Sequence, residues 1–311
     1  MIDLEGFNIN SRTTRGYAET GLANILGYVG EVTRKQLDVD TTGYYKSGDN
    51  IGITGIEKTY ERAIRGLRGI KYHNVDAQGI NMGSFENGAY DTLSQPGLNL
   101  VLTIDGALQK YAERLMDGKT GSLVAIDPSS GEILALVSAP SYDPSLFSGR
   151  AFSQNFATIQ RDSLKPLFNR PLQAMYPPGS MFKTIQALIA LEQNQVRADE
   201  IITVNGQLIG DHAPPGRYDM ERAITKSSNN YFFKVFRRVI QQGEDPSPFI
   251  DSRIGYSKWR DYVLQFGFGK MLDIDLPNEK AGFVPSLESY DKIYGKDGWK
   301  FSNIYSLSIG Q

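Results

Sequence analysis

Short apolar stretches separated by glycines characterise residues 1–94. Residues 25–29 form one such stretch, and glycines recur at short intervals after it: Gly43, Gly48, Gly52, Gly55, Gly66 and Gly69. Glycines at this density predict short strands joined by turns. A cluster of Ser, Gln, Pro and Gly at residues 94–97 marks a further turn, and the texture of the chain changes after it. We place a domain boundary there and expect residues 95–311 to form a second domain.

Helices are predicted by apolar residues that recur on one face. In residues 55–65, Ile56, Tyr60 and Ile64 recur every fourth residue and predict a helix. Three further segments have helical patterns: residues 107–116, 181–192 and 231–240. The second of these is mostly apolar, and the third is amphipathic.

Strands are predicted just beyond the boundary. Residues 98–105 alternate, with apolar side chains at positions 98, 100, 102 and 104 on one face. The apolar runs 122–126 and 132–137 are joined by Asp-Pro-Ser-Ser-Gly at 127–131, which predicts a hairpin. Strands and helices together predict an α+β fold.

Composition and charge exclude several classes of protein. The 33 Lys and Arg residues are balanced by 35 Asp and Glu residues, for a net charge of −2, which argues against a nucleic-acid partner. The absence of Cys excludes disulfides, a thiol nucleophile and thiolate metal sites. With only His73 and His212, no multi-histidine zinc site is possible, and we expect neither a metal nor a cofactor.

Common nucleotide and hydrolase motifs are missing. The sequence contains no G-x-x-x-x-G-K-[ST], no H-E-x-x-H, no G-x-S-x-G and no G-x-G-x-x-G that opens a helix. No run of 18 apolar residues occurs, and the first residues have neither a basic nor an apolar leader pattern. The chain as given is therefore expected neither to span a membrane nor to carry an export signal.

A candidate nucleophile lies at the start of the predicted apolar helix. Pro177, Pro178 and Gly179 force a turn that leaves Ser180 at the helix N-terminus, where free N–H groups favour developing negative charge. Lys183, three residues on, projects over the same face. On a nearly apolar helix this Lys would be partly desolvated, which lowers its pKa and allows a neutral amine to take the Ser proton. The alternative is that Ser180 is only an N-cap.

A second motif, Ser227-Ser228-Asn229, precedes the amphipathic helix. A hydroxyl at Ser227 could relay a proton, and the amide of Asn229 could bind a substrate carbonyl, if both point into one cleft. The alternative is an ordinary helix start, since Ser and Asn are preferred caps.

Ser-x-x-Lys followed by Ser-x-Asn resembles the penicillin-binding proteins and serine β-lactamases. Other segments are similar to the class B penicillin-binding proteins of the elongation type, the penicillin-binding protein 2 group. They are residues 26–31, 55–60, 100–105, 125–128, 140–144, 169–170, 176–180 and 306–311.

The resemblance implies a D,D-transpeptidase that cross-links peptidoglycan on the periplasmic side of the inner membrane. Ser180 would attack the D-Ala-D-Ala carbonyl of a stem peptide, with Lys183 as the base, Ser227 as a relay and Asn229 as a ligand for the peptide amide. β-Lactams would acylate Ser180. An antiparallel sheet with helices on both sides is implied for residues 95–311. Residues 1–94 would be the pedestal (dimerisation) domain, which contacts an elongation scaffold protein and a glycan-polymerising membrane partner.

The chain departs from the family pattern at both ends. No Lys-Thr/Ser-Gly motif, the family's third, follows Ser227. Residues 46–48 spell Lys-Ser-Gly but lie in the predicted pedestal, and we interpret them as a turn. The anchor helix of the family is also absent. We therefore expect a fragment of a longer protein, incomplete at its C-terminus and inactive as written, because the missing strand would supply part of the oxyanion hole.

Three alternatives remain open. The first is a cell-division transpeptidase, the second a β-lactam sensor, and the third a catalytically dead protein-interaction module. A metal held by His212 with Asp211 or Asp219 is less favoured than a plain loop His, because Cys is absent and the ligand spacing is poor.

Overall fold

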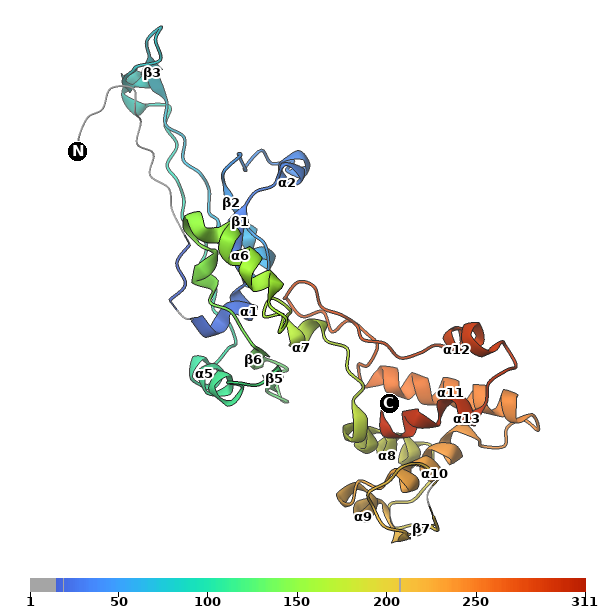
Figure 1. Cartoon of the computed structure of the whole chain (residues 1–311). Coiled ribbons are helices and arrows are strands. Elements are labelled where there is room, and N and C mark those ends of the chain that lie inside the picture. The colour runs from blue at the N-terminus through green and yellow to red at the C-terminus, as the bar shows by residue number, and fades with distance from the viewer. Residues whose placement is uncertain (1–14, 19, 207) are drawn as a thin grey trace. The chain divides into compact units, whose positions relative to one another are not determined.

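The computed structural model describes residues 15–18, 20–206 and 208–311 of the 311-residue chain, and it separates into two compact units (Figure 1). The first unit runs to Gln173 and takes in Asp273–Glu279, and the second comprises Ala174–Leu272 and Lys280–Gln311. The boundary that we expect at residues 94/95 falls inside the first unit and stays a prediction. The chain is of mixed α and β structure, as expected.

The described part of the first unit contains four antiparallel-paired strands before residue 94 and one hairpin after it. Its strands are β1 (Val29–Glu31), β2 (Asn50–Gly52), β3 (His73–Val75), β4 (Asn81–Ser84), β5 (Gly121–Ile126) and β6 (Ile133–Ala139). Its α-helices are α1 (Ala23–Leu26), α2 (Arg34–Val39), α3 (Gly55–Thr59), α4 (Glu61–Ile64), α5 (Gly106–Leu115), α6 (Phe152–Arg161) and α7 (Arg170–Gln173). Its 3₁₀ turns are η1 (Thr20–Leu22), η2 (Phe85–Gly88), η3 (Pro144–Phe147) and η4 (Gly149–Ala151).

The helix expected over residues 55–65 is present but broken. Tyr60 has φ −103° and ψ 15°, and it separates α3 from α4. The predicted apolar face is confirmed in part, since Ile56 and Tyr60 both contribute to the cluster formed by Ile25, Leu136, Leu172 and Leu276. Tyr60 also donates a 2.6 Å hydrogen bond to Asp275.

The prediction of a strand over residues 98–105 is wrong, because this segment has no strand structure. The segment pairs with β6 only through its end, where the Asp105 N–H donates to the Leu134 carbonyl over 2.9 Å and Thr103 Oγ1 donates to the Ile133 carbonyl over 2.7 Å. The alternating apolar residues of this segment are nevertheless partly buried, because Leu100, Leu102 and Ile104 pack against the apolar cluster around Ile56. Alternating burial therefore arose here without a ladder of backbone hydrogen bonds.

The hairpin predicted at residues 122–137 is confirmed as β5–β6. The two strands pair antiparallel from Gly121↔Ala139 to Ile126↔Ile133. Gly131, with φ +80°, closes the turn, and its N–H donates to the Asp127 carbonyl over 2.8 Å. Helix α5, capped by Asp105, packs on this hairpin, and Gln109 bonds to the backbone of Leu136 in both directions.

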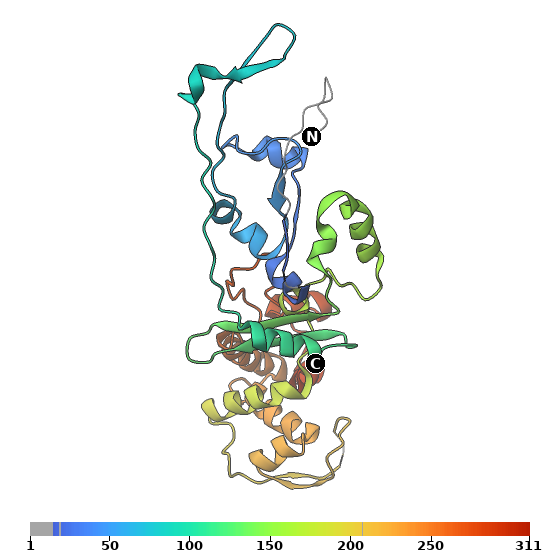
Figure 2. The same ribbon diagram turned by 90° about the vertical axis from the view of Figure 1, so that its left-hand side faces the viewer.

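A narrow arm leads away from the rest of the first unit and ends in the β3–β4 hairpin (Figure 2). All the residues of β3 and β4 are exposed. Large apolar side chains of the arm are exposed to solvent, namely those of Tyr72, Val75, Ile80 and Met82. No larger sheet among the described residues covers them.

The second unit is mainly helical. It contains η5 (Gly179–Phe182), α8 (Lys183–Glu192), β7 (Ile202–Val204), β8 (Gly216–Tyr218), α9 (Met220–Thr225), α10 (Asn229–Ile240), α11 (Pro248–Gln265), α12 (Leu287–Tyr294), α13 (Phe301–Ile304) and η6 (Tyr305–Ile309). Helix α10 packs against α8, α11 and η6 (Figure 1). The expected helices at 181–192 and 231–240 are confirmed. The second starts two residues earlier than predicted, and so does the first when η5 is counted with α8.

The core of the second unit explains these helices. The apolar face of α10 is fully buried, with Phe232, Val235, Phe236 and Val239 at 0% exposure. Trp259 of α11 contacts it through Phe236, at 5.4 Å between ring centroids. Burying such side chains contributes on the order of 2 kcal/mol each, so α8, α10 and α11 form the rigid base on which the candidate site is built. Within the described parts of the chain, no helix is long and apolar enough to cross a membrane.

Candidate active site

Ser180 lies in a tight turn at the head of α8. Gly179 takes φ +60°, a conformation that costs glycine little, and the 3₁₀ turn η5 begins there. The Ser180 side chain is exposed, and its carbonyl accepts the N–H of Lys183. The turn predicted from Pro177, Pro178 and Gly179 is therefore present, with the Ser on its outer side.

Lys183 is buried, although a lysine is ordinarily protonated and exposed. Its relative exposure is 2%, and its Nζ donates to three oxygens: the Ser227 carbonyl at 2.6 Å, Ser227 Oγ at 3.0 Å and Asn229 Oδ1 at 2.5 Å. The face of the Phe232 ring lies 5.9 Å away. A lysine ammonium has three donors, so these three oxygens satisfy it completely.

The pKa of Lys183 is shifted in the direction that the sequence predicted. Burial lowers it, because desolvation disfavours the charged amine, and the nearby Asp211 carboxylate acts in the opposite direction and raises it. The net shift is downward. A larger fraction of neutral amine is thus present at a given pH than for a free lysine.

Ser227 is held in a backbone conformation that few non-glycine residues adopt. Its φ is +51°, between the end of α9 and the start of α10. The N–H groups of Ser227 and Ser228 donate to the carbonyls of Ile224 and Ala223, both over 2.9 Å, which ties the bend to the end of α9. This bend directs both the carbonyl and the hydroxyl of Ser227 to Lys183.

Asn229 is the first residue of α10, while Ser228 caps the helix by accepting the N–H of Tyr231. The Asn229 amide is fixed at both ends, because Nδ2 donates to the Gly210 carbonyl over 2.6 Å and Oδ1 accepts from Lys183. The structure thus brings Lys183, Ser227 and Asn229 together. Among the described residues, no hydrogen bond links the Ser180 hydroxyl to any of them, and the catalytic roles of all four stay predictions.

Asp211 organises the second motif, a role that the sequence pattern does not indicate. Its carboxylate accepts from Ser228 Oγ at 3.1 Å, the Asn230 N–H at 2.8 Å and Asn230 Nδ2 at 3.0 Å. Burial would raise the pKa of Asp211, but the N–H groups of Asn230 and Ala213 hold it below its usual value. Asp211 is 17 residues before Ser228, so no spacing rule joins them, and we considered it only as a metal ligand.

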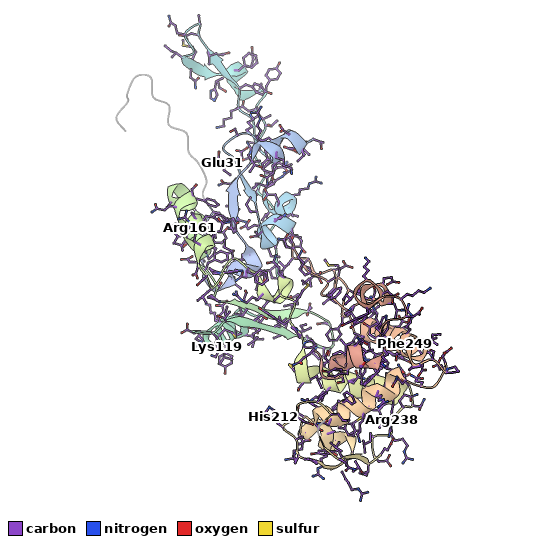
Figure 3. All side chains as sticks on the ribbon, turned by 45° about the vertical axis from the view of Figure 1, so that its right-hand side comes forward. Glu31, Lys119, Arg161, His212, Arg238 and Phe249 are labelled. Atoms are coloured by element: carbon purple, nitrogen blue, oxygen red, sulfur yellow. The ribbon has the colours of Figure 1, made fainter. Side chains whose placement is uncertain are left out.

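His212 lies on the loop that precedes β8 (Figure 3). Across residues 15–18, 20–206 and 208–311, no group of three or more His, Cys, Asp and Glu side chains is arranged to hold a metal ion.

The other sequence matches have ordinary structural explanations. The sequence contains a second Ser-x-x-Lys match, from Ser289 to Lys292. It lies in α12, where the Ser289 hydroxyl completes a capping box with Ser286. Lys-Ser-Gly at residues 46–48 belongs to a turn, as predicted, with Gly48 at φ +89°.

Comparison with known proteins places this geometry in a family. Residues 121–309 match the penicillin binding protein transpeptidase domain, and residues 1–102 match the penicillin-binding protein dimerisation domain. The peptidoglycan D,D-transpeptidase MrdA of Acinetobacter baumannii is 32% identical over 317 residues, covering 98% of this chain and 44% of that protein. MrdA of Escherichia coli K12 is 29% identical over 306 residues, covering 94% of this chain and 45% of that protein. The chain thus spans a little under half the length of these relatives.

Solved structures agree. PBP2 of Helicobacter pylori, in a complex with MreC, superposes with a TM-score of 0.77 at 29% identity, covering 96% of this chain and 54% of that one. PBP2 of Pseudomonas aeruginosa, in complex with WCK 5153, superposes with a TM-score of 0.71 at 28% identity, covering 97% of this chain and 61% of that one. The chain therefore belongs to the penicillin-binding proteins, and its homologues are class B members of the elongation type.

Proposed function

We propose that the protein to which this chain corresponds is a serine D,D-transpeptidase that cross-links peptidoglycan stem peptides during cell elongation. The observation that supports it most is the buried Lys183, with a lowered pKa, held by Ser227 and Asn229 three residues after an exposed Ser180. A serine with a neutral amine beside it needs no His to lose its proton.

The reaction has two halves. Neutral Lys183 takes the proton of Ser180, and the Ser180 oxygen bonds to the carbonyl carbon of the penultimate D-Ala. The amide bond to the last D-Ala then breaks, the leaving amine receives a proton from Lys183 through the Ser227 hydroxyl, and an ester to Ser180 remains. An amine of a second stem peptide then attacks the carbonyl carbon of this ester. A new amide bond forms, the bond to the Ser180 oxygen breaks, and the proton that the amine loses passes through Lys183 to that oxygen, which restores Ser180. Asn229 binds the donor peptide amide.

A penicillin provides the direct test, because its β-lactam ring opens on the same nucleophile and the ester persists. The full chain is exposed to a penicillin and its intact mass is measured, followed by peptide mapping. An adduct would overturn our expectation that the chain as written is inactive. An increase by one penicillin on the peptide that holds Ser180 supports the proposal. An unmodified mass contradicts a working nucleophile in this chain and favours the inactive fragment or the interaction module.

We assign the pedestal to residues 1–94 and the transpeptidase domain to residues 95–311, with β5–β6 as part of an antiparallel sheet flanked by helices. The site of action would be the periplasmic side of the inner membrane. An elongation enzyme would bind an elongation scaffold and a glycan-polymerising partner. Binding to division proteins would instead favour a division enzyme, and binding to neither would favour a β-lactam sensor.

The exposed β3–β4 arm is the surface that we assign to such a partner. Replacing Val75 and Met82, which are 64% and 67% exposed, by Ser should weaken capture of a purified MreC-type scaffold about tenfold or more, because the apolar contact area is lost. A matched pair, Tyr111→Ser with Leu115→Ser on the exposed face of α5, should bind as the unmodified chain does. Equal binding by both pairs would remove the arm from the interface.

The pH dependence of acylation tests the role of Asp211. The base must be neutral, so the rate rises as pH increases through the pKa of Lys183. Asp211 raises that pKa, and Asp211→Asn should therefore move the inflection of the penicillin acylation rate to lower pH. Asp199→Asn, an exposed carboxylate paired with Arg197, serves as the control and should leave the inflection in place. An inflection that moves to higher pH in Asp211→Asn would contradict this account.

A further inference from the structure

The turn that holds Ser180 is in direct contact with a second turn, formed by residues 306–311. The Gly310 carbonyl accepts the N–H of Gly179 over 3.0 Å. Gly310 itself lies in the left-handed region, with φ +75° and ψ 31°. A Cβ atom at Gly310 would lie 2.4 Å from the Gly179 carbonyl oxygen, 2.9 Å from the Gly179 nitrogen and 2.8 Å from Phe182 Cβ.

We propose that Gly310 is a positioning residue for the nucleophile: it braces the Gly179–Phe182 turn and thereby sets the place of the Ser180 hydroxyl. The catalytic part of this inference rests on the proposed function. The structural part concerns only the contact between the two turns.

Neither side of the contact can yield easily. Phe182 is 4% exposed and packs edge-on against Trp259 and Phe268, at 6.0 and 5.8 Å between ring centroids. The other neighbour is the backbone of Gly179, not the end of a flexible side chain. A contact below 3.0 Å with such groups requires the turn itself to shift.

The 306–311 turn is held in place from its own side. The Gly310 N–H donates to the Leu307 carbonyl over 3.1 Å, and the Gln311 N–H donates to the Ser306 carbonyl over 3.2 Å. Ser306 Oγ donates to the Gln311 carbonyl over 3.1 Å. Tyr305, which immediately precedes this turn, packs on Phe233 of α10 with 5.9 Å between ring centroids. The brace is therefore attached to the same helix whose first turn carries Asn229.

The consequence for chemistry follows from the place of Ser180 between the two braced residues. Gly179 precedes it and Phe182 follows it by two, so a displacement of either moves the hydroxyl relative to Lys183. A misplacement of about 1 Å at a reacting group can cost on the order of a hundredfold in rate.

Gly310→Ala tests the brace, with Gly243→Ala as the matched control. Gly243 has nearly the same φ, +76°, but nothing lies within 4 Å of a Cβ placed there. In the full chain, amide hydrogen exchange at Gly179 should become about tenfold faster in Gly310→Ala, because the Gly310 acceptor is displaced, and remain unchanged in Gly243→Ala. Penicillin acylation should slow by about tenfold to a hundredfold in the first variant alone.

Gly310→Asn separates the close contact from the backbone preference. Asn tolerates a positive φ but still carries a Cβ, so it should behave like Ala if the contact is what matters. If Gly310→Ala does not fold, Ser306→Ala loosens the brace without adding an atom and should speed exchange at Gly179 to a smaller extent.

The outcomes distinguish the two proposals. Unchanged exchange at Gly179 in Gly310→Ala, or an equal change in Gly243→Ala, would overturn the brace whatever the acylation result. An unmodified chain that takes no penicillin adduct would count against the proposed function, while the exchange measurement would still decide on the brace.

Discussion

Ser180→Ala should abolish the penicillin adduct completely, while the unfolding transition stays where it was. The oxygen that forms the ester is removed, and the hydroxyl that contacts Lys183, that of Ser227, has the role of proton relay in the proposed reaction. The Ser180 side chain is exposed, so its loss costs little stability. Intact mass spectrometry after a fixed exposure measures the adduct, and thermal unfolding measures stability.

The chain offers a matched control for this experiment. Ser289 begins the other Ser-x-x-Lys match, and its hydroxyl completes the capping box of α12. Ser289→Ala should keep the full adduct and should lose only the N3 half of the capping box, since Ser286 remains as the N-cap. An adduct that persists in Ser180→Ala, or that disappears in Ser289→Ala, would place the nucleophile elsewhere.

Lys183→Arg should reduce the penicillin acylation rate by roughly 10²- to 10⁴-fold, the range attributed to general base catalysis. Arginine keeps a cation and several donors for Ser227 and Asn229, but it cannot lose a proton near neutral pH. Lys183→Met should show a similar loss of rate, with an additional loss of stability, because two oxygens of Ser227 and one of Asn229 lose their donor. Acylation time courses measured at several penicillin concentrations give the rate.

Lys292→Met is the corresponding control, since Lys292 ends the second Ser-x-x-Lys match and lies in α12. It should leave the acylation rate unchanged. If Lys183→Arg reacts at the rate of the unmodified chain, a charged group suffices at this position and a neutral amine is not the base.

Local pattern was enough to place the site on its elements. The apolar helix after Ser180 and the amphipathic helix after Ser227 are present. Pro and Gly residues set the turn before Ser180, and the hairpin at residues 121–139 follows from its central turn. Each of these depends on neighbours close in the chain, where turn chemistry and periodicity act directly.

Other expectations failed for reasons that lie outside local pattern. Residues 98–105 alternate as a strand does, but among the described residues only their end bonds to β6. Pairing depends on which backbone lies alongside, and alternation does not specify it. Tyr60 interrupts the predicted helix, and its hydroxyl bonds to Asp275, 215 residues away.

The sequence by itself determined the family, the two motifs and the chemical types of their side chains. Only the tertiary structure decided that the Lys183 amine meets Ser227 and Asn229, 44 and 46 residues away. It also decided that Asp211 anchors the start of α10 and that Gly310 contacts the Ser180 turn. These contacts join segments that are distant along the chain. They exist because packing of α8, α10 and α11 buries a common apolar core, and burial on that scale is a property of the whole unit and not of any local pattern.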